Sequence, residues 1–405
     1  MKIVDVEIIP IRPRLAERYD HRRFDLRQID CRNVFRVTTD NGIVGYGDTR
    51  TRRDPPPRSS VEHFIDRDPF EFINSTEGDL NGAIYDVLGK HLEQPAYRLM
   101  GEKVRDRVKV AAWTRPASPD DFAKEIQRSV DQGYMTFKMH SCKYFDVLEQ
   151  TRAAEEVAPE GFKIHWDFNG DSGGPRTIGG VLQLIKHIEE NHPIVGFIED
   201  ALTRSDLESW CQLREKMNVP LVMHVPPLGG IHEVVHGAAD IYMIGSGHGG
   251  LRRGFAYAAL NIPTIMQAEA GTIGKAFALH TAAVLPTMTQ HAINLDDQYE
   301  EDYATTEIPV VDGFSPVPEG PGLGIEVDEE VLRRMAGQQE QEIPRVVGIL
   351  RMPGGSVYHG PEYVDPDGEE GTVRGMQSEL WTDDGTEKFA AAYRRVQAEG
   401  VVQVA

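Results

Sequence analysis

Phe137-Lys138-Met139-His140 is a short apolar stretch that ends in a polar residue, and two later stretches of the chain repeat this form. They are Ile164-His165-Trp166-Asp167-Phe168-Asn169 and Phe197-Ile198-Glu199-Asp200. The three stretches recur about every thirty residues, and the segments between them have the apolar spacing of helices. This pattern predicts parallel strands joined by helices. Because the C-terminal ends of parallel barrel strands face the mouth of the barrel, we expect Lys138, His140, Asp167 and Glu199 to converge.

Eight strand-like runs alternate with helix-like segments after residue 107. They are 108–113, 136–140, 163–168, 196–199, 221–225, 241–244, 264–267 and 291–295. The clearest helix begins at Ser118-Pro119-Asp120-Asp121, where a capping residue precedes a proline and two acids. Eight alternating strands predict an α/β fold with a (β/α)8 TIM-type barrel over 108–330. An open doubly wound sheet is the alternative, although no Gly-x-Gly-x-x-Gly motif follows an early strand.

The segments on either side of the barrel have different patterns. Residues 1–107 combine alternating strands, a hairpin turn at Asp40-Asn41-Gly42 and a helical stretch within 61–100, so we expect an α+β domain there. Two polar loops, about 12–27 and 48–60, interrupt it. Residues 331–405 contain several turns and one late helix at 387–398. We expect this extension to pack back on the N-terminal domain.

Charge and cysteine content limit the class of partner. The 405 residues carry 43 basic and 64 acidic side chains, a formal net charge of −21, which disfavours nucleic acids and anionic membranes. The three cysteines are widely spaced, which indicates a reducing compartment. No apolar run reaches the roughly 18 residues of a membrane span, and the N-terminus alternates as a strand does. We therefore expect a cytoplasmic protein that acts on a small molecule.

Asp167 and Glu199 at neighbouring strand ends suit a hard cation such as Mg²⁺, with the Asn169 amide nearby. Such a cation holds a substrate carboxylate and stabilises the enolate that forms when the α-proton leaves. Lys138 or His140 then serves as the base or the acid. The simpler alternative is that the two acids only cap loops.

Three further stretches resemble a known family. Asn81-Gly82-Ala83-Ile84-Tyr85-Asp86-Val87-Leu88-Gly89-Lys90 and Pro95-Ala96-Tyr97-Arg98-Leu99-Met100-Gly101 resemble the helix signature of the enolase superfamily, in the branch of mandelate racemase and muconate-lactonizing enzymes. Pro321-Gly322-Leu323-Gly324-Ile325 resembles the motif that follows its barrel. The resemblance covers about 1–335. It implies an N-terminal capping domain over a modified barrel, Mg²⁺, proton abstraction next to a carboxylate, and a homo-oligomer.

The chain departs from that family at the strand ends. The second barrel strand ends in Lys138-Met139-His140, where the family commonly has Lys-x-Lys. The fifth strand offers His224, or leaves the position empty if Val225 aligns, where the family has an acid. Histidine as the third ligand shifts the preference from Mg²⁺ towards another, softer divalent cation.

The family's histidine–aspartate dyad on the sixth and seventh strands has no match here. His248 stands in a glycine-rich turn after the sixth strand, and Glu269 follows the seventh strand, which ends at Gln267. Asn294 stands where the family has an eighth-strand glutamate. We keep His248 and Glu269 as candidate acid–base residues, with a turn histidine as the simpler interpretation of His248.

The pattern favours a metal-dependent dehydratase of a sugar acid or hydroxy acid. Asp167, Glu199 and His224 are the candidate metal ligands, and Lys138 and His140 are the candidate base and acid. Because one face of acid–base groups is clear, β-elimination of water is favoured over racemisation, which needs a base on each face. A racemase or epimerase that uses Glu269 or His248 opposite Lys138 is the first alternative. A non-catalytic relative that binds an acidic ligand is the second.

Overall fold

The computed structural model of the chain describes residues 1–19, 31–50, 54–75, 80–170, 176–267, 271–339, 344–367 and 373–405. The chain divides into two compact units. The first contains Met1–Glu17, Asp25–Trp113 and Met243–Gln341, and the second contains Arg18–Phe24, Thr114–Tyr242 and Glu342–Ala405. No helix of the described residues is both long enough and apolar enough to cross a membrane.

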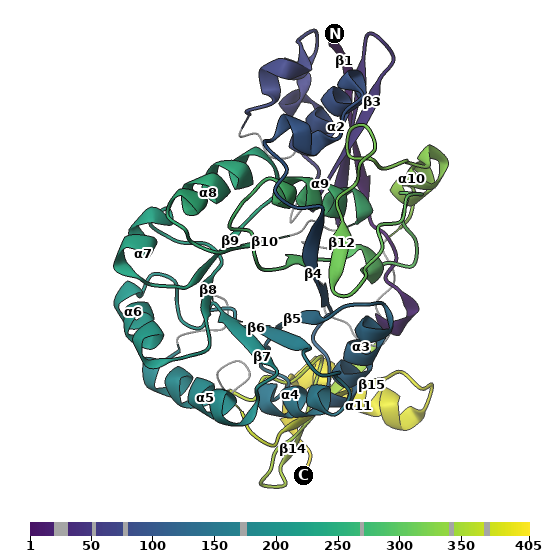
Figure 1. Cartoon of the computed structure of the whole chain (residues 1–405). Helices are drawn as coiled ribbons and strands as arrows, with labels where there is room; N and C mark the ends of the chain where they lie inside the picture. Colours follow the sequence, from purple (N-terminus) through teal and green to yellow (C-terminus); the bar gives the residue numbers. More distant parts are fainter. Residues whose placement is uncertain are drawn as a thin grey trace. The chain divides into compact units, whose positions relative to one another are not determined.

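Eight parallel strands form a closed barrel (Figure 1). They are β4 (Arg107–Trp113), β5 (Thr136–His140), β6 (Lys163–Asp167), β7 (Val195–Glu199), β8 (Leu221–Met223), β9 (Ile241–Ile244), β10 (Thr264–Met266) and β11 (Ala292–Ile293). Their order in the sheet is their order in the chain, and β11 pairs with β4 to close it. A ninth strand, β12 (Phe314–Pro316), runs antiparallel to β4. The predicted fold class is confirmed, with strand ends within two residues of those expected.

Seven α-helices follow the barrel strands in the chain. They are α3 (Pro119–Asp131), α4 (Val147–Glu155), α5 (Ile178–Asn191), α6 (Leu207–Lys216), α7 (Ile231–His236), α8 (Gly247–Ala259) and α9 (Thr272–Ala283). The α3 helix begins where its sequence predicts, because the Ser118 side chain accepts a hydrogen bond from Asp121 N and Pro119 occupies the first turn. In Figure 1, α4 to α7 lie outside the strands β5 to β8 of the same unit.

The N-terminal domain consists of an antiparallel sheet, β1 (Ile3–Ile11), β2 (Arg32–Thr39) and β3 (Val44–Arg50), and the helix α2 (Asn81–Leu92). The helix packs directly on β3, since a Cβ atom at Gly45 would lie 2.6 Å from Val87 Cγ2. Of the described residues in the helical stretch expected within 61–100, those at 81–92 form α-helix, and short 3₁₀ turns begin at or directly after Pro69 and Pro95. The 3₁₀ turns among the described residues are Glu17–Tyr19, Arg58–Ser60, Glu62–Phe64, Pro69–Phe72, Ala96–Leu99 and Asp296–Gln298.

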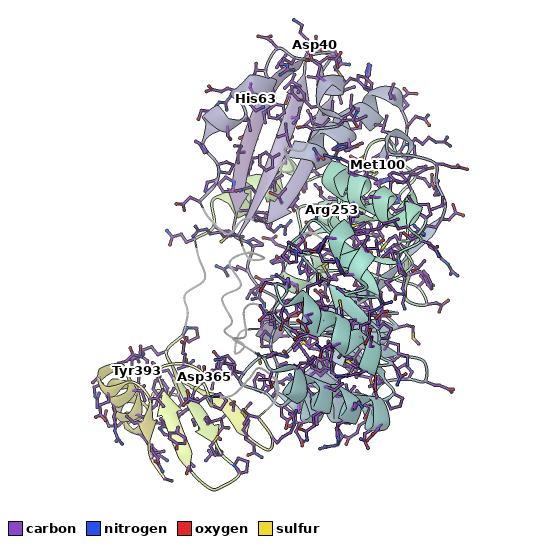
Figure 2. All side chains as sticks on the ribbon, turned by 90° about the vertical axis from the view of Figure 1, so that its left-hand side faces the viewer. Asp40, His63, Met100, Arg253, Asp365 and Tyr393 are labelled. Carbon is purple, nitrogen blue, oxygen red and sulfur yellow. The ribbon has the colours of Figure 1, made fainter. Side chains whose placement is uncertain are left out.

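The end of the chain forms a separate α/β layer that we call the C-terminal module, residues 344–405. Its sheet has the order β15 (Gln377–Thr382), β13 (Val346–Arg351), β14 (Val357–Gly360) and β16 (Val402–Gln403), and α11 (Glu387–Glu399) packs on it. The module is yellow in Figure 1, and Figure 2 labels its residues Asp365 and Tyr393.

The C-terminal module belongs to the second unit, where Lys143 and Asp146 pair with its Asp365 and Arg374. The preceding helix α10 (Glu329–Ala336) belongs to the first unit, where Glu329 accepts a hydrogen bond from Arg36 of the N-terminal sheet at 2.9 Å. The expected packing of residues 331–405 on the N-terminal domain stays a prediction.

Candidate active site

Three neighbouring strands of the second unit bring the predicted acid–base residues together. His140 pairs in register with Asp167 on the next strand, and Asp167 pairs with Glu199 on the one after. Lys138 lies two positions before His140, so it shares the same face of the sheet. Lys138, Asp167 and Glu199 are buried, and His140 is partly exposed. The convergence expected from the sequence is therefore present within one compact unit.

Lys138 is the centre of this cluster. Its Nζ atom lies 2.6 Å from Asp167 Oδ2, 2.7 Å from His140 Nε2 and 3.5 Å from Glu199 Oε2. Burial disfavours the ammonium form, but the charges of Asp167 and Glu199 outweigh burial and raise the pKa of Lys138. Lys138 is thus protonated at rest, and because an ammonium group only donates, we assign His140 Nε2 as the acceptor of this hydrogen bond.

Asp167 is held as a carboxylate. Burial acts to raise its pKa, but the neighbouring Lys138 and His140 and the hydrogen bonds that it accepts bring the pKa below its usual range. One of these bonds comes from Asn169 N at 2.8 Å to Oδ1. Asn169 has a left-handed backbone (φ 54°), which asparagine tolerates better than most residues, and its side chain donates to Ser141 O at 2.9 Å. Asn169 therefore joins the ends of β5 and β6.

Glu199 is a fully buried carboxylate to which no hydrogen bond from the described residues is made. The Nδ1 atom of His224 lies 3.4 Å from Oε1 of Glu199, and this contact is not a hydrogen bond. Burial, and then the charge of Asp167, raise the pKa of Glu199 well above its usual value. A buried carboxylate without donors is costly unless it is neutralised or binds a cation. Glu199 is therefore the strongest single indication of a cation site.

This carboxylate belongs to a cluster of three possible metal ligands. Glu199, Asp200 and His224 each offer one atom within 4.8 Å of the others. When ionised, the three carboxylates at 167, 199 and 200 outnumber the positive charges of Lys138 and Arg204, so a bound cation would neutralise the group. The donor set fits a divalent cation, with oxygen ligands suited to Mg²⁺ and a histidine suited to softer ions.

Asp200 is the member of this cluster that the sequence analysis missed. Its Oδ1 accepts a hydrogen bond from His224 N at 3.1 Å, and its Oδ2 accepts one from Arg204 Nε at 2.9 Å. It thus connects the ends of β7 and β8 and holds His224 beside Glu199. An arginine four residues after Asp200 was the available signal. Asp167, predicted as a ligand, lies outside the three-residue cluster and pairs with Lys138 instead.

The candidates for the opposite catalytic face lie in the first unit or outside the described residues. His248 belongs to the first unit, where its backbone N–H donates to Asn81 Oδ1 at 2.9 Å. Burial, with a smaller effect of Arg252, lowers the pKa of its imidazole. Glu269 lies outside the described residues. Both remain predictions. His165, two residues before Asp167, stacks on Phe197 with ring centroids 3.6 Å apart, which is a packing role.

Comparison with known proteins identifies the family. The family model "Enolase C-terminal domain-like" matches residues 121–331. A D-galactonate dehydratase of Pectobacterium atrosepticum is 24% identical over an alignment of 368 residues, and the match covers 80% of this chain and 94% of that protein. One of Variovorax paradoxus is 25% identical over an alignment of 194 residues, and the match covers 45% of this chain and 50% of that protein. The chain thus spans about half the length of the Variovorax relative that it matches.

Solved structures share the fold. A mandelate racemase/muconate lactonizing family protein from an Azoarcus species has a TM-score of 0.67 at 21% identity, and the match covers 84% of this chain and 98% of that one. An N-succinyl Arg/Lys racemase of Bacillus cereus has a TM-score of 0.67 at 20% identity, with 84% and 99% covered. The chain belongs to the enolase superfamily, in the branch of mandelate racemase and muconate-lactonizing enzymes.

Proposed function

We propose that this protein is an acid-sugar dehydratase that depends on a divalent cation. It would remove the proton next to a carboxylate and eliminate a β-hydroxyl group as water. The observation that carries the proposal is the contact between Lys138 Nζ and His140 Nε2 at 2.7 Å, beside the carboxylate of Glu199 that lacks hydrogen-bond donors. The relatives called D-galactonate dehydratases support a sugar acid as the substrate class.

Glu199 and His224 would hold the cation, with Asp200 or Asp167 as the further ligand. When bound, the cation would supply positive charge for the substrate carboxylate and for the enolate that develops from it. Mg²⁺ is the family's usual ion. Because His224 offers a nitrogen ligand, a softer divalent cation could bind in place of Mg²⁺.

The pair Lys138–His140 accounts for both proton transfers. At rest Lys138 is an ammonium and His140 is neutral. Transfer of one proton from Nζ to Nε2 would give a neutral amine, which is a base, and an imidazolium, which is an acid. The amine would then take the α-proton, and the imidazolium would protonate the leaving hydroxyl group. Water leaves, and both side chains return to their resting state with no net proton gained or lost.

A racemase or epimerase of the same substrate class is the alternative within the family. It needs an acid–base group on the opposite face of the substrate, and the candidates for that role are His248 and Glu269. A non-catalytic protein that binds an acidic ligand is the alternative outside catalysis. A cytoplasmic location and a homo-oligomer also remain predictions.

Proton NMR in D₂O with Mg²⁺ and a panel of acid sugars that includes D-galactonate separates these functions. A dehydratase gives a 2-keto-3-deoxy acid, a racemase or epimerase gives deuterated substrate and its epimer, and a binding protein gives neither. His140→Gln and Lys138→Met should each lose both α-proton exchange and the dehydrated product, because Lys138 becomes a base only when His140 takes its proton. Lys124→Met, at an exposed position on α3, is the matched control. Exchange with no elimination by the unmodified protein on any substrate would refute the dehydratase.

A further inference from the structure

The C-terminal module lies beyond the part of the chain that the family explains. The family match ends at residue 331, and the module begins at 344. The module nevertheless belongs to the same compact unit as β5, β6 and β7, which carry the candidate active site. Its contacts in that unit therefore need an explanation of their own.

Two layers cover the central strand β13 of the module. The α11 helix covers one face, where Val347, Phe389 and Val396 pack together. Residues 361–367 and 373–376, which we call the strap, follow β14 and precede β15 in the chain and cover the other face around Leu350, Val364 and Met376. Gly348 allows this close packing, because a Cβ atom there would collide with the carbonyl oxygen of Glu362. The described residues of the strap are thus fixed against the sheet behind them.

The strap contacts the loop that leaves the active site, residues 141–146 between β5 and α4. Two ion pairs of opposite polarity join them: Lys143 Nζ lies 2.7 Å from Asp365 Oδ2, and Arg374 pairs with Asp146. Because each side supplies one acid and one base, the two pairs favour a single register between strap and loop. Asp365 is labelled in Figure 2.

Aromatic packing reinforces the ion pairs. The ring of Tyr363 stacks on Tyr144 with centroids 5.0 Å apart and meets the edge of Phe145 at 5.6 Å. Phe145 is buried. Edge-to-face and stacked rings at these separations stabilise a contact beyond the area that they bury. The strap therefore contacts the middle of the loop as well as its end.

The loop that the strap contacts is also bonded to the catalytic strands. At one end Ser141 follows His140, donates its N–H to Asp167 O at 2.8 Å and accepts from Asn169 Nδ2 at 2.9 Å. At the other end Asp146 is buried and caps α4 by accepting from Leu148 N at 2.9 Å. Gly375 N of the strap donates to the same carboxylate at 3.3 Å. Residues 141–146 are all that separates His140 from α4, so the loop is a short connection between the strap and the end of β5.

We propose that the C-terminal module is a positioning element of the active site. Its strap holds the 141–146 loop and thereby fixes His140 against Lys138, with Arg374 and Tyr363 as the positioning residues. The catalytic consequence rests on the dehydratase proposed above, whereas the positioning of His140 does not.

Arg374→Gln tests the proposal, with Arg351→Gln as the matched control. Both arginines are partly exposed and form an ion pair, but Arg351 pairs with Glu379 inside the module. In the full-length protein, Arg374→Gln should speed amide hydrogen exchange in peptides that cover 137–147 by about tenfold, the effect of losing a charge-assisted bond. Arg351→Gln should leave those peptides unchanged. Tyr363→Leu should repeat the effect by a different contact.

Two further measurements separate positioning from general loosening. The His140 imidazole signal in NMR, assigned by its loss in His140→Gln, should shift or split in Arg374→Gln and not in Arg351→Gln. Turnover of D-galactonate by Arg374→Gln should fall in kcat with little change in KM. Asp146→Asn keeps the helix cap and loses the ion pair, so the double variant should be no worse than either single one.

The outcomes distinguish this proposal from the proposed function. Unchanged exchange in 137–147 and an unchanged His140 signal in Arg374→Gln overturn the positioning role, whatever the activity. A changed His140 signal in a protein that dehydrates no acid sugar supports the positioning role and refutes the proposed dehydratase function. A changed signal with unaltered kcat in an active enzyme overturns the catalytic part of the proposal.

Discussion

The side chains of Lys138 and Asp167 meet across two neighbouring parallel strands, with Nζ 2.6 Å from Oδ2 and both groups buried. A buried ion pair of this kind is costly to break from one side, because the remaining charge loses its partner. The pair therefore serves two purposes: it stabilises the strand ends, and it keeps a proton beside His140.

Lys138→Arg should separate these two purposes. Arginine keeps a positive charge for Asp167 but does not act as a base, because its pKa is too high. We expect near-normal stability with α-proton exchange reduced at least about a hundredfold. Lys138→Met should lose exchange and also roughly 3 kcal/mol of unfolding free energy, measured by urea denaturation. Exchange that survives in Lys138→Arg would show that another group is the base.

Glu199→Gln should weaken cation binding and stabilise the metal-free protein. The substitution removes a buried charge that lacks hydrogen-bond donors, so the melting temperature without metal should rise. Calorimetric affinity for Mg²⁺ or Mn²⁺ should fall at least about tenfold. Glu233→Gln is the contrast, because that buried glutamate accepts hydrogen bonds from Leu228 N and Gly230 N and should destabilise the protein when changed. Equal effects of the two variants would contradict a cation site at Glu199.

The metal-free protein should also become less stable as pH rises because of Glu199. Its pKa is higher in the folded protein than its usual 4.5, so the folded state binds the extra proton between those two values. Stability is then lost as pH increases from about 4.5 through the folded pKa. Glu199→Gln should remove this contribution, as would a saturating cation, when unfolding is followed across the range.

His224→Ala tests whether the histidine is a ligand. Its Nδ1 atom is within the same cluster as the oxygens of Glu199 and Asp200. Loss of a nitrogen ligand should weaken binding of Mn²⁺ or Zn²⁺ more than that of Mg²⁺, which prefers oxygen. Titration of the three ions against wild type and variant gives the ratio directly. An unchanged ratio would exclude His224 from the coordination shell.

Asp48→Asn should destabilise the first unit strongly. Arg32 donates to Asp48 from Nε at 3.2 and 3.1 Å, and both side chains are fully buried. Removing the carboxylate charge leaves the guanidinium uncompensated, at a cost of roughly 3–5 kcal/mol. Arg32→Met combined with Asp48→Asn should recover part of that loss in chemical denaturation. If the losses of unfolding free energy in the two single variants simply add in the double variant, the two side chains do not depend on each other and the prediction fails.

His280 should make the protein sensitive to acid. It is buried, Tyr97 N donates to its Nδ1 at 3.3 Å, and its Nε2 donates to Leu323 O at 3.2 Å. Burial lowers its pKa from 6.5 to about 4. The unfolded chain binds a proton first as pH falls, so stability contributed by the neutral ring is present above pH 6.5 and is lost on acidification towards about 4. The loss amounts to roughly 3 kcal/mol in unfolding experiments, and His280→Gln should flatten it.

Local pattern was sufficient for the barrel and for the convergence of Lys138, Asp167 and Glu199. Alternation of short apolar runs with capped helices placed the strands β5 and β9 at their exact bounds, because strand and helix periods are properties of neighbouring residues. The position of Lys138, Asp167 and Glu199 at strand ends then required their convergence. The pattern did not separate the short 3₁₀ turns near Pro69 and Pro95 from the helix α2, because the capping box of Asp68 and Glu71 begins a 3₁₀ turn as well as it begins an α-helix.

The sequence by itself determined which side chains meet at the strand ends, since parallel strands align their C-terminal ends. Tertiary structure alone decided which interactions each of them makes there. Asp167 forms an ion pair with Lys138, Asp200 forms one with Arg204, and Glu199 accepts no hydrogen bond from the described residues. It also decided that Arg374 reaches Asp146, 228 positions earlier in the chain. Pairing of charges depends on distances between residues far apart in the chain, and no local pattern contains those distances.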